Sequence, residues 1–377
     1  YKQRDEIHGQ LSAQGSSLHI YTGEPLVVWK ELLSRYEVQS VYVNKDYEPY
    51  ALQRDRQIGE LFQRSGISFH DFKDQVIFEE DEILKNDGQP YTVFTPYKRK
   101  WLERFKTETP KAAGLTAGGF IQCTGFFPPM ETLGFAPSVI KVLPYDLSRL
   151  EDYPHMRNFP GPDATSYLSP HLRFGTISIR QLIAGLAPSD EVFLSELIWR
   201  EFFMQILFHF PKVVTQNFKA KYNGISWRNN EDDFDRWCRG ETGYPMVDAG
   251  MRQLNETGYM HNRVRMVCAS FLCKHLLTDW RMGEAYFARK LLDYELSSNN
   301  GNWQWAAGTG CDAAPYFRIF NPQEQLKKFD PDLEYVRRWV PEYGTPEYVS
   351  PMLDHKFARN RALEIYKDGL LNYLPEG

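Results

Sequence analysis

The sequence predicts an α/β N-terminal half built on a parallel sheet, followed by a larger all-α half. From residue 17 to about residue 71, short β-branched or aromatic runs alternate with helical patterns, which is the spacing of a βαβαβ unit. Beyond a stretch rich in glycine and proline, strand signals almost vanish and amphipathic helical windows follow one another. The 377 residues are enough for two or three domains at about 150 residues each.

Local patterns predict the elements of the N-terminal half. Strands are expected at residues 18–21, 41–43 and 67–70, with helices over 25–35 and 51–64 between them. Pro25 stands at the start of the first of these helices, where its missing N–H group costs nothing. The turns carry neither GxGxxG nor GxxxxGKS/T, so this half shows no dinucleotide or P-loop phosphate site.

A long interdomain linker is expected over residues 107–144, because glycine and proline cluster there. We therefore expect an α/β domain over residues 1–106 and a helical domain over residues 145–377. One helix of the second domain is expected to begin at Ser169, where a serine precedes a proline. Amphipathic patterns predict further helices over residues 181–186, 193–210, 246–255, 262–277, 283–294 and 357–366.

The composition excludes several classes of protein. With 42% hydrophobic and 25% charged residues the chain is globular and not disordered, and no run of about 18 apolar residues could span a membrane. The five cysteines form no CxxC or His-paired pattern, so we expect neither disulfides nor a metal site, and a reducing, cytoplasmic location. The net charge of −5 means that any DNA-binding surface must be a local patch. The first residue is Tyr1 and not Met, so we expect the sequence to begin part-way into a longer protein.

Three segments of the helical half carry candidate functional residues. Thr165, Ser166 and Ser169 lie around a predicted helix start, where free amides and the helix dipole favour phosphate, although an ordinary N-cap is the commoner explanation. Glu196 and Trp199 share a face with a guanidinium at Arg200, which is either a site or a solvated ion pair beside a buried indole. Residues 297–305 have the amides and glycine of a solvent loop but end in two tryptophans. These tryptophans either pack in the core or line a site, and the sequence leaves both interpretations open.

Five motifs of the helical half then carry a resemblance. They are ELIWREF from Glu196, TGYPMVDAGMRQL from Thr242, MHNRVRM from Met260, NNGNWQWAAGTG from Asn299 and APYFRIFNP from Ala314. In this order they resemble the FAD domain of the photolyase/cryptochrome family, and within it most closely the bacterial class I cyclobutane pyrimidine dimer photolyases. VNKDYEPY from Val43 is similar to the family's α/β antenna domain, whose first strand, first helix and second strand have no counterpart in this sequence.

The resemblance implies FAD as cofactor. The residues that match cofactor-binding positions of the family are Tyr153, Thr165, Ser166 and Ser169 at the phosphates, Leu168 beside them, Arg265 and Asp293 beside the flavin ring, Glu295 in place of a ribose-contacting aspartate, and Asn299 near flavin N5. An asparagine at position 299 resembles the repair enzymes, because photoreceptors of the family commonly carry aspartate or cysteine there.

The resemblance also implies a substrate, damaged DNA, and a route for electrons. The positions that match those receiving a pyrimidine dimer are Glu196, Trp199, Asn262, Met266 and Trp305. The positions that match the family's electron-transfer chain are Trp227, Trp280 and Trp303, and those that match DNA-phosphate contacts are Arg157, Arg263 and Arg318. A single His261 before Asn262 favours the cyclobutane dimer over the (6-4) lesion, whose repair uses a histidine pair.

The expected function is therefore light-driven repair of cyclobutane pyrimidine dimers by electron transfer from reduced FAD, in a monomer without membrane contact. The alternatives are a cryptochrome-type photoreceptor with little repair activity, and a flavoprotein or DNA-binding scaffold without photochemistry. Tyr50 and Ala51 replace an Asn-Glu pair of the folate-binding members, which disfavours folate and leaves the type of an antenna chromophore open.

Overall fold

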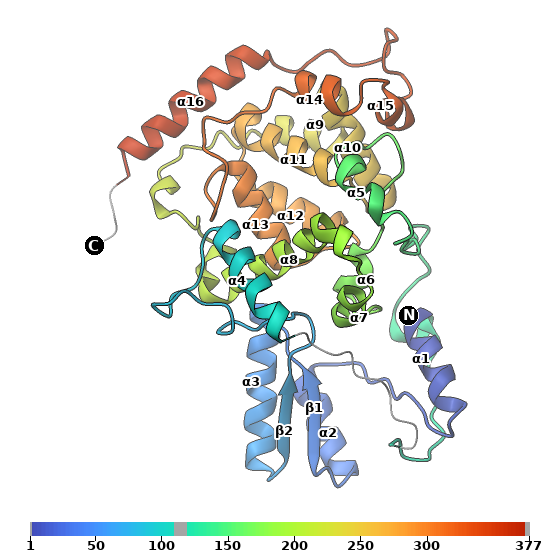
Figure 1. The fold of residues 1–377 in the computed structure, drawn as a ribbon. Helices are drawn as coiled ribbons and strands as arrows, with labels where there is room; N and C mark the ends of the chain where they lie inside the picture. The colour runs from blue at the N-terminus through green and yellow to red at the C-terminus, as the bar shows by residue number, and fades with distance from the viewer. Residues whose placement is uncertain (1, 109–118, 374–377) are drawn as a thin grey trace. The chain divides into compact units, whose positions relative to one another are not determined.

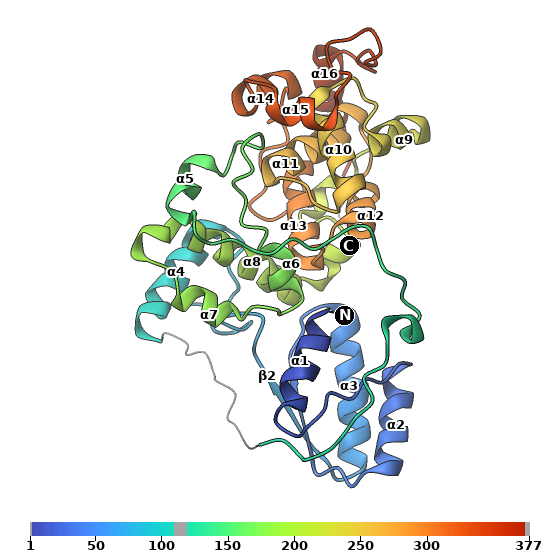
Figure 2. The same ribbon diagram turned by 90° about the vertical axis from the view of Figure 1, so that its right-hand side faces the viewer.

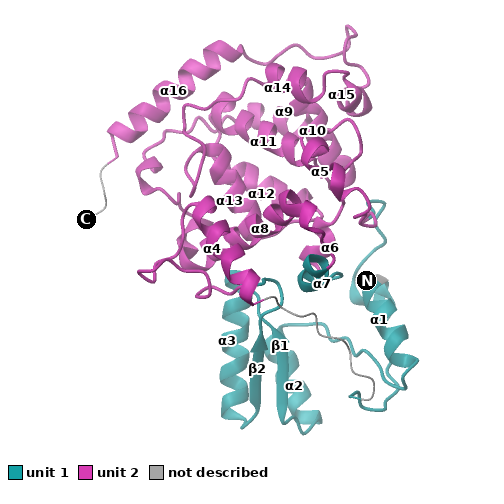
Figure 3. Cartoon of the chain, viewed as in Figure 1, with its two compact units in different colours: residues 1–77, 110–141, 175–184 teal, residues 78–109, 142–174, 185–377 magenta. Residues whose placement is uncertain are grey.

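The computed structural model describes residues 2–108 and 119–373, so residues 109–118 of the expected linker lie outside the described part. The chain divides into two compact units that interleave along the sequence (Figure 3). Unit 1 comprises residues 1–77, 110–141 and 175–184, and unit 2 comprises residues 78–109, 142–174 and 185–377. The domain boundaries expected at residues 106 and 144 stay a prediction.

Unit 1 contains the parallel sheet that the sequence predicts. Strands β1 (Ser40–Asn44) and β2 (Ser68–Phe72) pair in parallel, with Ser40 opposite Ser68. Helices α2 (Pro25–Arg35) and α3 (Pro49–Arg64) pack against them through one apolar cluster around Phe62 and Trp29, whose rings lie 4.8 Å apart. Figure 1 shows these four elements together. The remaining elements of the unit are α1 (Lys2–Ser12), a 3-10 turn (Met130–Leu133) and α7 (Ile179–Ala184).

The strand predicted at residues 18–21 does not form, and this prediction is wrong. The backbone of this region bonds elsewhere, since the Leu18 amide donates to His8 Nδ1 at 3.4 Å and Gly15 O accepts from the Cys123 amide at 3.0 Å. These contacts hold the segment against α1 and against the stretch around Cys123. The expected βαβαβ unit is therefore reduced to two strands among the described residues.

Unit 2 is helical, as predicted, and its described residues form no strand beyond an isolated bridge between Leu84 and Pro90. Its α-helices, drawn from two directions in Figures 1 and 2, are α4 (Phe94–Thr107), α5 (Tyr153–Met156), α6 (Ser169–Arg173), α8 (Glu191–His209), α9 (Glu231–Arg239), α10 (Pro245–Thr257), α11 (Asn262–Ser270), α12 (Trp280–Lys290), α13 (Leu296–Ala307), α14 (Pro322–Phe329), α15 (Glu334–Trp339) and α16 (His355–Leu371). Short 3-10 turns lie at Leu150–Asp152, Pro188–Asp190, Pro211–Val214 and Ala220–Tyr222.

The window predicted as one helix over residues 262–277 is divided in the structure. Helix α11 ends at Ser270, and a π-helical turn, Phe271–Leu276, continues the chain. Every residue of this turn is buried. π-Helical turns occur inside or next to α-helices, frequently at functional sites.

Residues 297–305, which have the composition of a solvent loop, lie inside helix α13. Their amides are bound internally, because the Asn300 and Gln304 side chains donate to the Val213 carbonyl at 2.9 and 3.0 Å. Gly301 allows α13 to approach α8, since a Cβ there would lie 2.1 Å from the Phe203 ring. Helix α13 is therefore fixed by packing partners that local sequence cannot reveal.

The core of unit 2 is an apolar cluster shared by α9 to α13. Its members include the fully buried Trp237, Met246, Leu272 and Ala307. No helix among the described residues combines the length and the apolar character needed to cross a bilayer.

Candidate functional site

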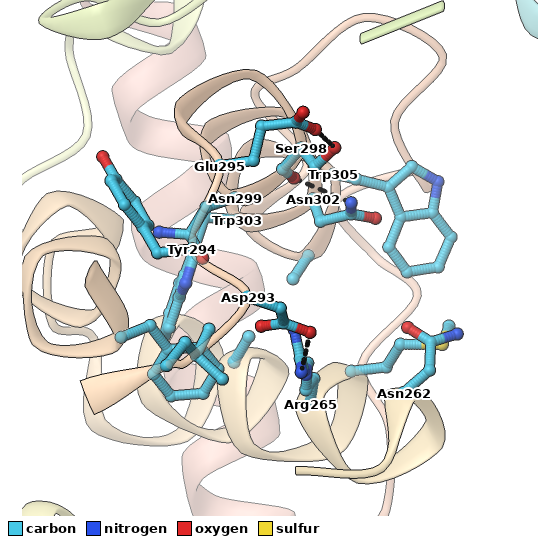
Figure 4. A pocket seen from close by; sticks show the side chains of 15 residues that line it. Asn262, Arg265, Asp293, Tyr294, Glu295, Ser298, Asn299, Asn302, Trp303 and Trp305 are labelled. Carbon is cyan, nitrogen blue, oxygen red and sulfur yellow. Dashed lines mark hydrogen bonds and ion pairs between the residues drawn. The ribbon is translucent and has the colours of Figure 1, made fainter. Parts of the chain in front are cut away.

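A pocket in unit 2 lies between α11, α13 and the segment that precedes α13 (Figure 4). It holds about 610 Å³ of atom-free space, part of it open to solvent. Figure 4 shows Asn262 and Trp305 at one side, Tyr294 at the other, and Arg265 with Asp293 between them. The lining residues are Asn262, Arg265, Met266, Ala269, Phe287, Leu291, Asp293, Tyr294, Glu295, Ser298, Asn299, Asn302, Trp303, Trp305 and Ala306.

An ion pair lies at the centre of the pocket. Arg265 donates to Asp293 Oδ2 at 2.8 Å, and Ser169 at the start of α6 donates to the same oxygen at 2.6 Å. Asp293 Oδ1 is buried and has no hydrogen-bond partner among the described residues. Three of the predicted cofactor-binding residues are therefore in contact, and one carboxylate oxygen is left to accept a hydrogen bond from a ligand.

The amide of Asn299 is held by a neighbouring carboxylate. Its Nδ2 donates to Glu284 Oε1 at 2.8 Å and to the Glu284 carbonyl at 3.1 Å. Because both hydrogens of this amide are used, Asn299 Oδ1 is the atom that can accept a hydrogen bond from a bound group. Burial raises the pKa of Glu284, while its bonds with Asn299 and Tyr294 oppose that shift.

Glu295 lines the pocket, but other side chains bind its carboxylate. Arg200 pairs with Oε1 at 3.1 Å, and Ser298 donates to Oε2 at 2.6 Å. The ion pair is largely buried, with side-chain exposures of 14% and 7%. It joins α8 to the start of α13, and the predicted ribose contact of Glu295 would compete with these two bonds.

The other walls of the pocket are apolar. Trp303 is 2% exposed and meets the Phe287 ring edge-to-face at 4.9 Å. Met266 and Trp305 are partly buried, whereas Asn262 is exposed at the first position of α11. The pocket thus combines apolar side chains with polar groups, among them the guanidinium of Arg265, the carboxylates of Asp293 and Glu295 and the amide of Asn299.

The other two predicted lesion-contacting residues, Glu196 and Trp199, are not among the residues that line this pocket. Glu196 pairs with Arg157 at 2.7 Å, and both side chains are about one-third exposed. Arg157 also lies 5.4 Å from the Tyr153 ring centroid. Burial, together with the charge of Glu196, raises the pKa of Tyr153 to about 12. Trp199 stacks on Phe94 of α4, with ring centroids 3.6 Å apart.

The predicted helix start at Ser169 is confirmed, but the predicted cap is wrong. Leu168 occupies the N-cap position of the five-residue helix α6, and the Ser169 hydroxyl is bound to Asp293 instead of to the backbone. Leu168 is buried, and the Ser166 carbonyl accepts from the Asp146 amide at 2.9 Å. Thr165, Ser166, Leu168 and Ser169 are not among the residues that line the pocket described above. Ser169 reaches the pocket indirectly, because it contacts Asp293, which does line it.

The three predicted DNA-phosphate contacts carry like charges that act on one another. Burial lowers the pKa of Arg263, and the charges of Arg157 and Arg318 lower it further. Arg263 donates to Asn158 at 2.6 Å and lies over the Phe329 ring at 4.3 Å. Arg318 is exposed. An anion would relieve the repulsion among these cations.

The three tryptophans predicted to carry electrons lie in or against the core of unit 2. Trp303 and Trp280 are buried, and Trp280 donates from Nε1 to Asn217 at 2.8 Å. Trp227 is partly buried, packs against the core and meets the Tyr366 ring edge-on at 5.8 Å. The route from the pocket wall at Trp303 to the surface stays a prediction.

Sequence reasoning missed several pocket residues. Tyr294, Ser298 and Asn302 line the pocket, and Glu284 holds the amide of Asn299 in place. A helical reading of residues 296–307 would have found Asn302, because it lies three positions after Asn299 on the same helix face. No local signal marks Glu284, since its partner Asn299 comes from another helix. Helical spacing did mark Arg200 on a candidate face, but it did not reveal that its partner is Glu295.

The comparisons with known proteins identify the family of this chain. The sequence model described as the FAD binding domain of DNA photolyase matches residues 193–346, and the one described as DNA photolyase matches residues 4–114. The deoxyribodipyrimidine photo-lyase of Halobacterium salinarum is 38% identical in an alignment that covers 94% of this chain and 84% of that protein. This chain belongs to the photolyase/cryptochrome family.

Solved photolyases have the same fold. A class III photolyase from Agrobacterium tumefaciens superimposes with a TM-score of 0.86 at 34% identity, over 97% of this chain and 86% of that one. An archaeal photolyase from Sulfolobus tokodaii, solved with two FAD molecules, gives a TM-score of 0.83 at 34% identity over the same shares. The family and the photolyase fold inferred from the motifs are confirmed, and the class I assignment stays a prediction.

The residues of the pocket fit the flavin of FAD, the cofactor of this family. The apolar side chains around Trp303 suit an aromatic ring system, and the guanidinium of Arg265 suits its carbonyl edge. Asp293 Oδ1, which is buried without a partner among the described residues, and Asn299 Oδ1 can each accept a hydrogen bond from an N–H of the ring.

In the antenna region Ala51 is buried and Tyr50 is 65% exposed, and neither offers the carboxylate of an Asn-Glu pair.

Proposed function

We propose that this photolyase repairs cyclobutane pyrimidine dimers with light, and that the pocket in unit 2 is where flavin and lesion meet. The observation that carries the proposal is the composition of one pocket. Arg265, Asp293 and Asn299 supply polar groups to it, and Trp305, Met266 and Asn262 line it with them. Reduced FAD, when bound, would supply after absorption of light the electron that splits the two bonds of the dimer, and would regain it once they have broken, so that no net redox change results.

The protein's own groups orient and protect the cofactor. Arg265 places a positive charge beside the ring, and Asp293 fixes that guanidinium. Glu284 fixes the amide of Asn299, so that Oδ1 faces a ring N–H. Trp303 and Phe287 exclude water from one side of the pocket.

The lesion side of the pocket is suited to a splayed, non-planar dimer. Trp305 and Met266 offer an apolar surface, and an aromatic contact of this kind contributes about 1–3 kcal/mol per base. Asn262 is exposed and can donate to a C4 carbonyl, which gains negative charge when an electron arrives. Photolyases are an established example of base flipping, for which unstacking costs about a few kcal/mol.

Glu196 and Trp199 complete the proposed lesion site from α8. Glu196 is paired with Arg157, so a DNA phosphate that attracts Arg157 would release the carboxyl group for a pyrimidine. Trp199 presents an indole braced by Phe94 and Phe203. We propose the same roles for these residues as the motifs predict.

DNA contacts, electron supply, assembly and location complete the proposal. Arg157, Arg263 and Arg318 bind phosphates of the damaged strand. Trp303, Trp280 and Trp227 would carry electrons from an external reductant at the surface to oxidised flavin. The protein acts as a monomer in the cytoplasm.

The test is repair by the purified protein under blue light. A thymine-dimer oligonucleotide is incubated with the protein in light and in darkness, and intact thymines are measured. The expected result is repair in light alone, with loss of repair and retained FAD in Glu196→Ala and Trp199→Ala. Bound FAD without repair would favour a photoreceptor, and protein without flavin would overturn both functions. Unchanged repair in the two variants would refute the assigned lesion site.

A further inference from the structure

Lys274 is a buried cation that the proposed chemistry does not use. Its side chain is 1% exposed, in the π-helical turn that follows α11, and none of the ion pairs among the described residues involves it. A buried ammonium is costly unless other groups replace its hydration. Its contacts therefore identify what it stabilises.

The contacts of Lys274 converge on the end of α13. Its Nζ donates to the Ala307 carbonyl at 2.6 Å and to the Tyr316 carbonyl at 3.3 Å. It also lies 3.6 Å from the centroid of the Tyr366 ring. The Tyr366 hydroxyl donates to the same Ala307 carbonyl at 2.8 Å. The π-helical turn and the C-terminal helix α16 thus hold one oxygen atom of α13.

Ala307 is the last residue of α13, so its carbonyl has no partner within the helix. A cation at this end is also favoured by the helix dipole. Burial lowers the pKa of Lys274 to about 7, and both the ammonium and the neutral amine can donate to the carbonyl. We call this arrangement of Lys274, Tyr366 and the Ala307 carbonyl the α13 clamp.

The clamp holds the end of α13 that carries Trp305, a residue of the pocket wall. Trp305 belongs to the last turn of α13, two residues before Ala307, whereas Asn299 belongs to the first turn. Asp293 and Glu295, which face the flavin region, precede the helix. Loosening the last turn would therefore displace the indole that meets the lesion before it disturbs the groups around the flavin.

We propose that Lys274 is a positioning residue for lesion recognition, which acts with Tyr366 by fixing the end of α13 and so the indole of Trp305. The proposal rests on the function proposed above. It assigns a role in substrate recognition to a lysine outside the pocket and to the C-terminal helix.

The test compares binding in darkness to a thymine-dimer oligonucleotide and to the same undamaged oligonucleotide. Lys274→Met removes the donor and keeps the chain length, and Tyr366→Phe removes one hydroxyl and keeps the ring. Loss of a buried hydrogen bond predicts a roughly tenfold lower preference for the lesion in Lys274→Met and a smaller decrease in Tyr366→Phe. Lys327→Met, at an exposed ion pair on α14, is the matched control and should keep the preference.

Two further readouts separate positioning from general damage. The FAD absorption spectrum and the affinity for undamaged DNA should stay at the wild-type level in both variants. In repair assays the lesion concentration at half-maximal rate should rise, while repair per absorbed photon at saturation should stay constant.

Wild-type lesion preference in folded Lys274→Met and Tyr366→Phe would overturn the clamp and leave the proposed function intact. If Lys274→Met does not fold, Tyr366→Phe decides, and an unchanged preference in it is sufficient to refute the proposal. A wild-type protein without lesion preference would instead refute the proposed function, and with it the role of the clamp.

Discussion

Single residues of this photolyase serve the pocket through partners that are far away in sequence. Ser169 and Asp293 lie 124 positions apart, yet the serine hydroxyl donates to the aspartate that also holds Arg265. Glu284 fixes the orientation of the Asn299 amide, and Arg200 forms an ion pair with Glu295. The residue types were evident from the sequence, whereas these pairings follow from the packing of separate helices.

Asp293→Asn should weaken FAD binding. The substitution keeps the size of the side chain but removes the charge that pairs with Arg265 and an acceptor for Ser169. Loss of such a charged hydrogen bond predicts about a 10- to 100-fold increase in the Kd for FAD, measured by flavin fluorescence on the refilled apoprotein. Glu241→Gln, at an exposed ion pair with Arg239, should bind FAD as the wild type does. Equal Kd values for the two variants would contradict the role of Asp293.

His261 should make the protein sensitive to acid. Burial, with Arg263 and Arg265 nearby, lowers its pKa from 6.5 to about 4. Between these values the unfolded chain binds a proton that the folded chain does not, so the free energy of unfolding falls as the pH falls through this window. The His261 ring also caps α11 by accepting from the Arg263 amide.

His261→Asn keeps a cap acceptor and removes the titrating group. Urea unfolding at pH 7 and pH 5 should therefore show a smaller loss of stability in this variant than in the wild type. The same loss in both proteins would assign the acid sensitivity to other groups.

Helix α13 is the element that decides the site, and close approach to its neighbours sets its position. Because Gly301 has no side chain, the Phe203 ring of α8 can pack against it, and Gly283 of α12 leaves room for the Trp303 ring in the same way. The Asn300 and Gln304 amides bind carbonyls of the turn at Val213. Helix propensity alone disfavours this segment, which is why its composition predicts a loop and its surroundings form a helix.

Gly283→Ala should destabilise the protein and disturb the pocket wall. The new Cβ would lie 2.2 Å from the Trp303 ring and 2.5 Å from Leu272. Overpacking of this kind predicts a loss of about 1–3 kcal/mol in the free energy of unfolding, visible as a lower Tm. Gly9→Ala in α1, where a Cβ meets no atom within 4 Å, is the control and should be neutral or slightly stabilising. A wild-type Tm in Gly283→Ala would refute the close contact.

The whole molecule has a net charge of −5, so its proposed affinity for DNA must come from a local surface. The charges of Arg157 and Arg318 both act on Arg263, although the three residues come from different parts of the chain. Unit 1 keeps a two-stranded parallel sheet with its two helices. The order of the motifs identified the family and the helical class of the larger half. It did not predict that the two units interleave along the sequence.

Affinity for damaged DNA should depend steeply on salt. Each phosphate contact contributes about −0.9 to the slope of log K against log salt concentration on B-DNA. Replacing Arg157, Arg263 and Arg318 one at a time by glutamine should reduce the magnitude of that slope by about 1 each, in fluorescence anisotropy titrations. A slope that none of the three substitutions changes would place the phosphate contacts elsewhere.

The sequence by itself determined the family, the helical class of the larger half and the kinds of side chain that we propose to serve flavin and lesion. These depend on motif order and local periodicity, which a linear chain displays directly. The tertiary structure decided which groups meet, such as Arg157 with Glu196 and Ser169 with Asp293, and that residues 18–21 form no strand. Those outcomes depend on long-range packing and on competition for backbone partners, because a segment adopts the contacts that its folded neighbours offer.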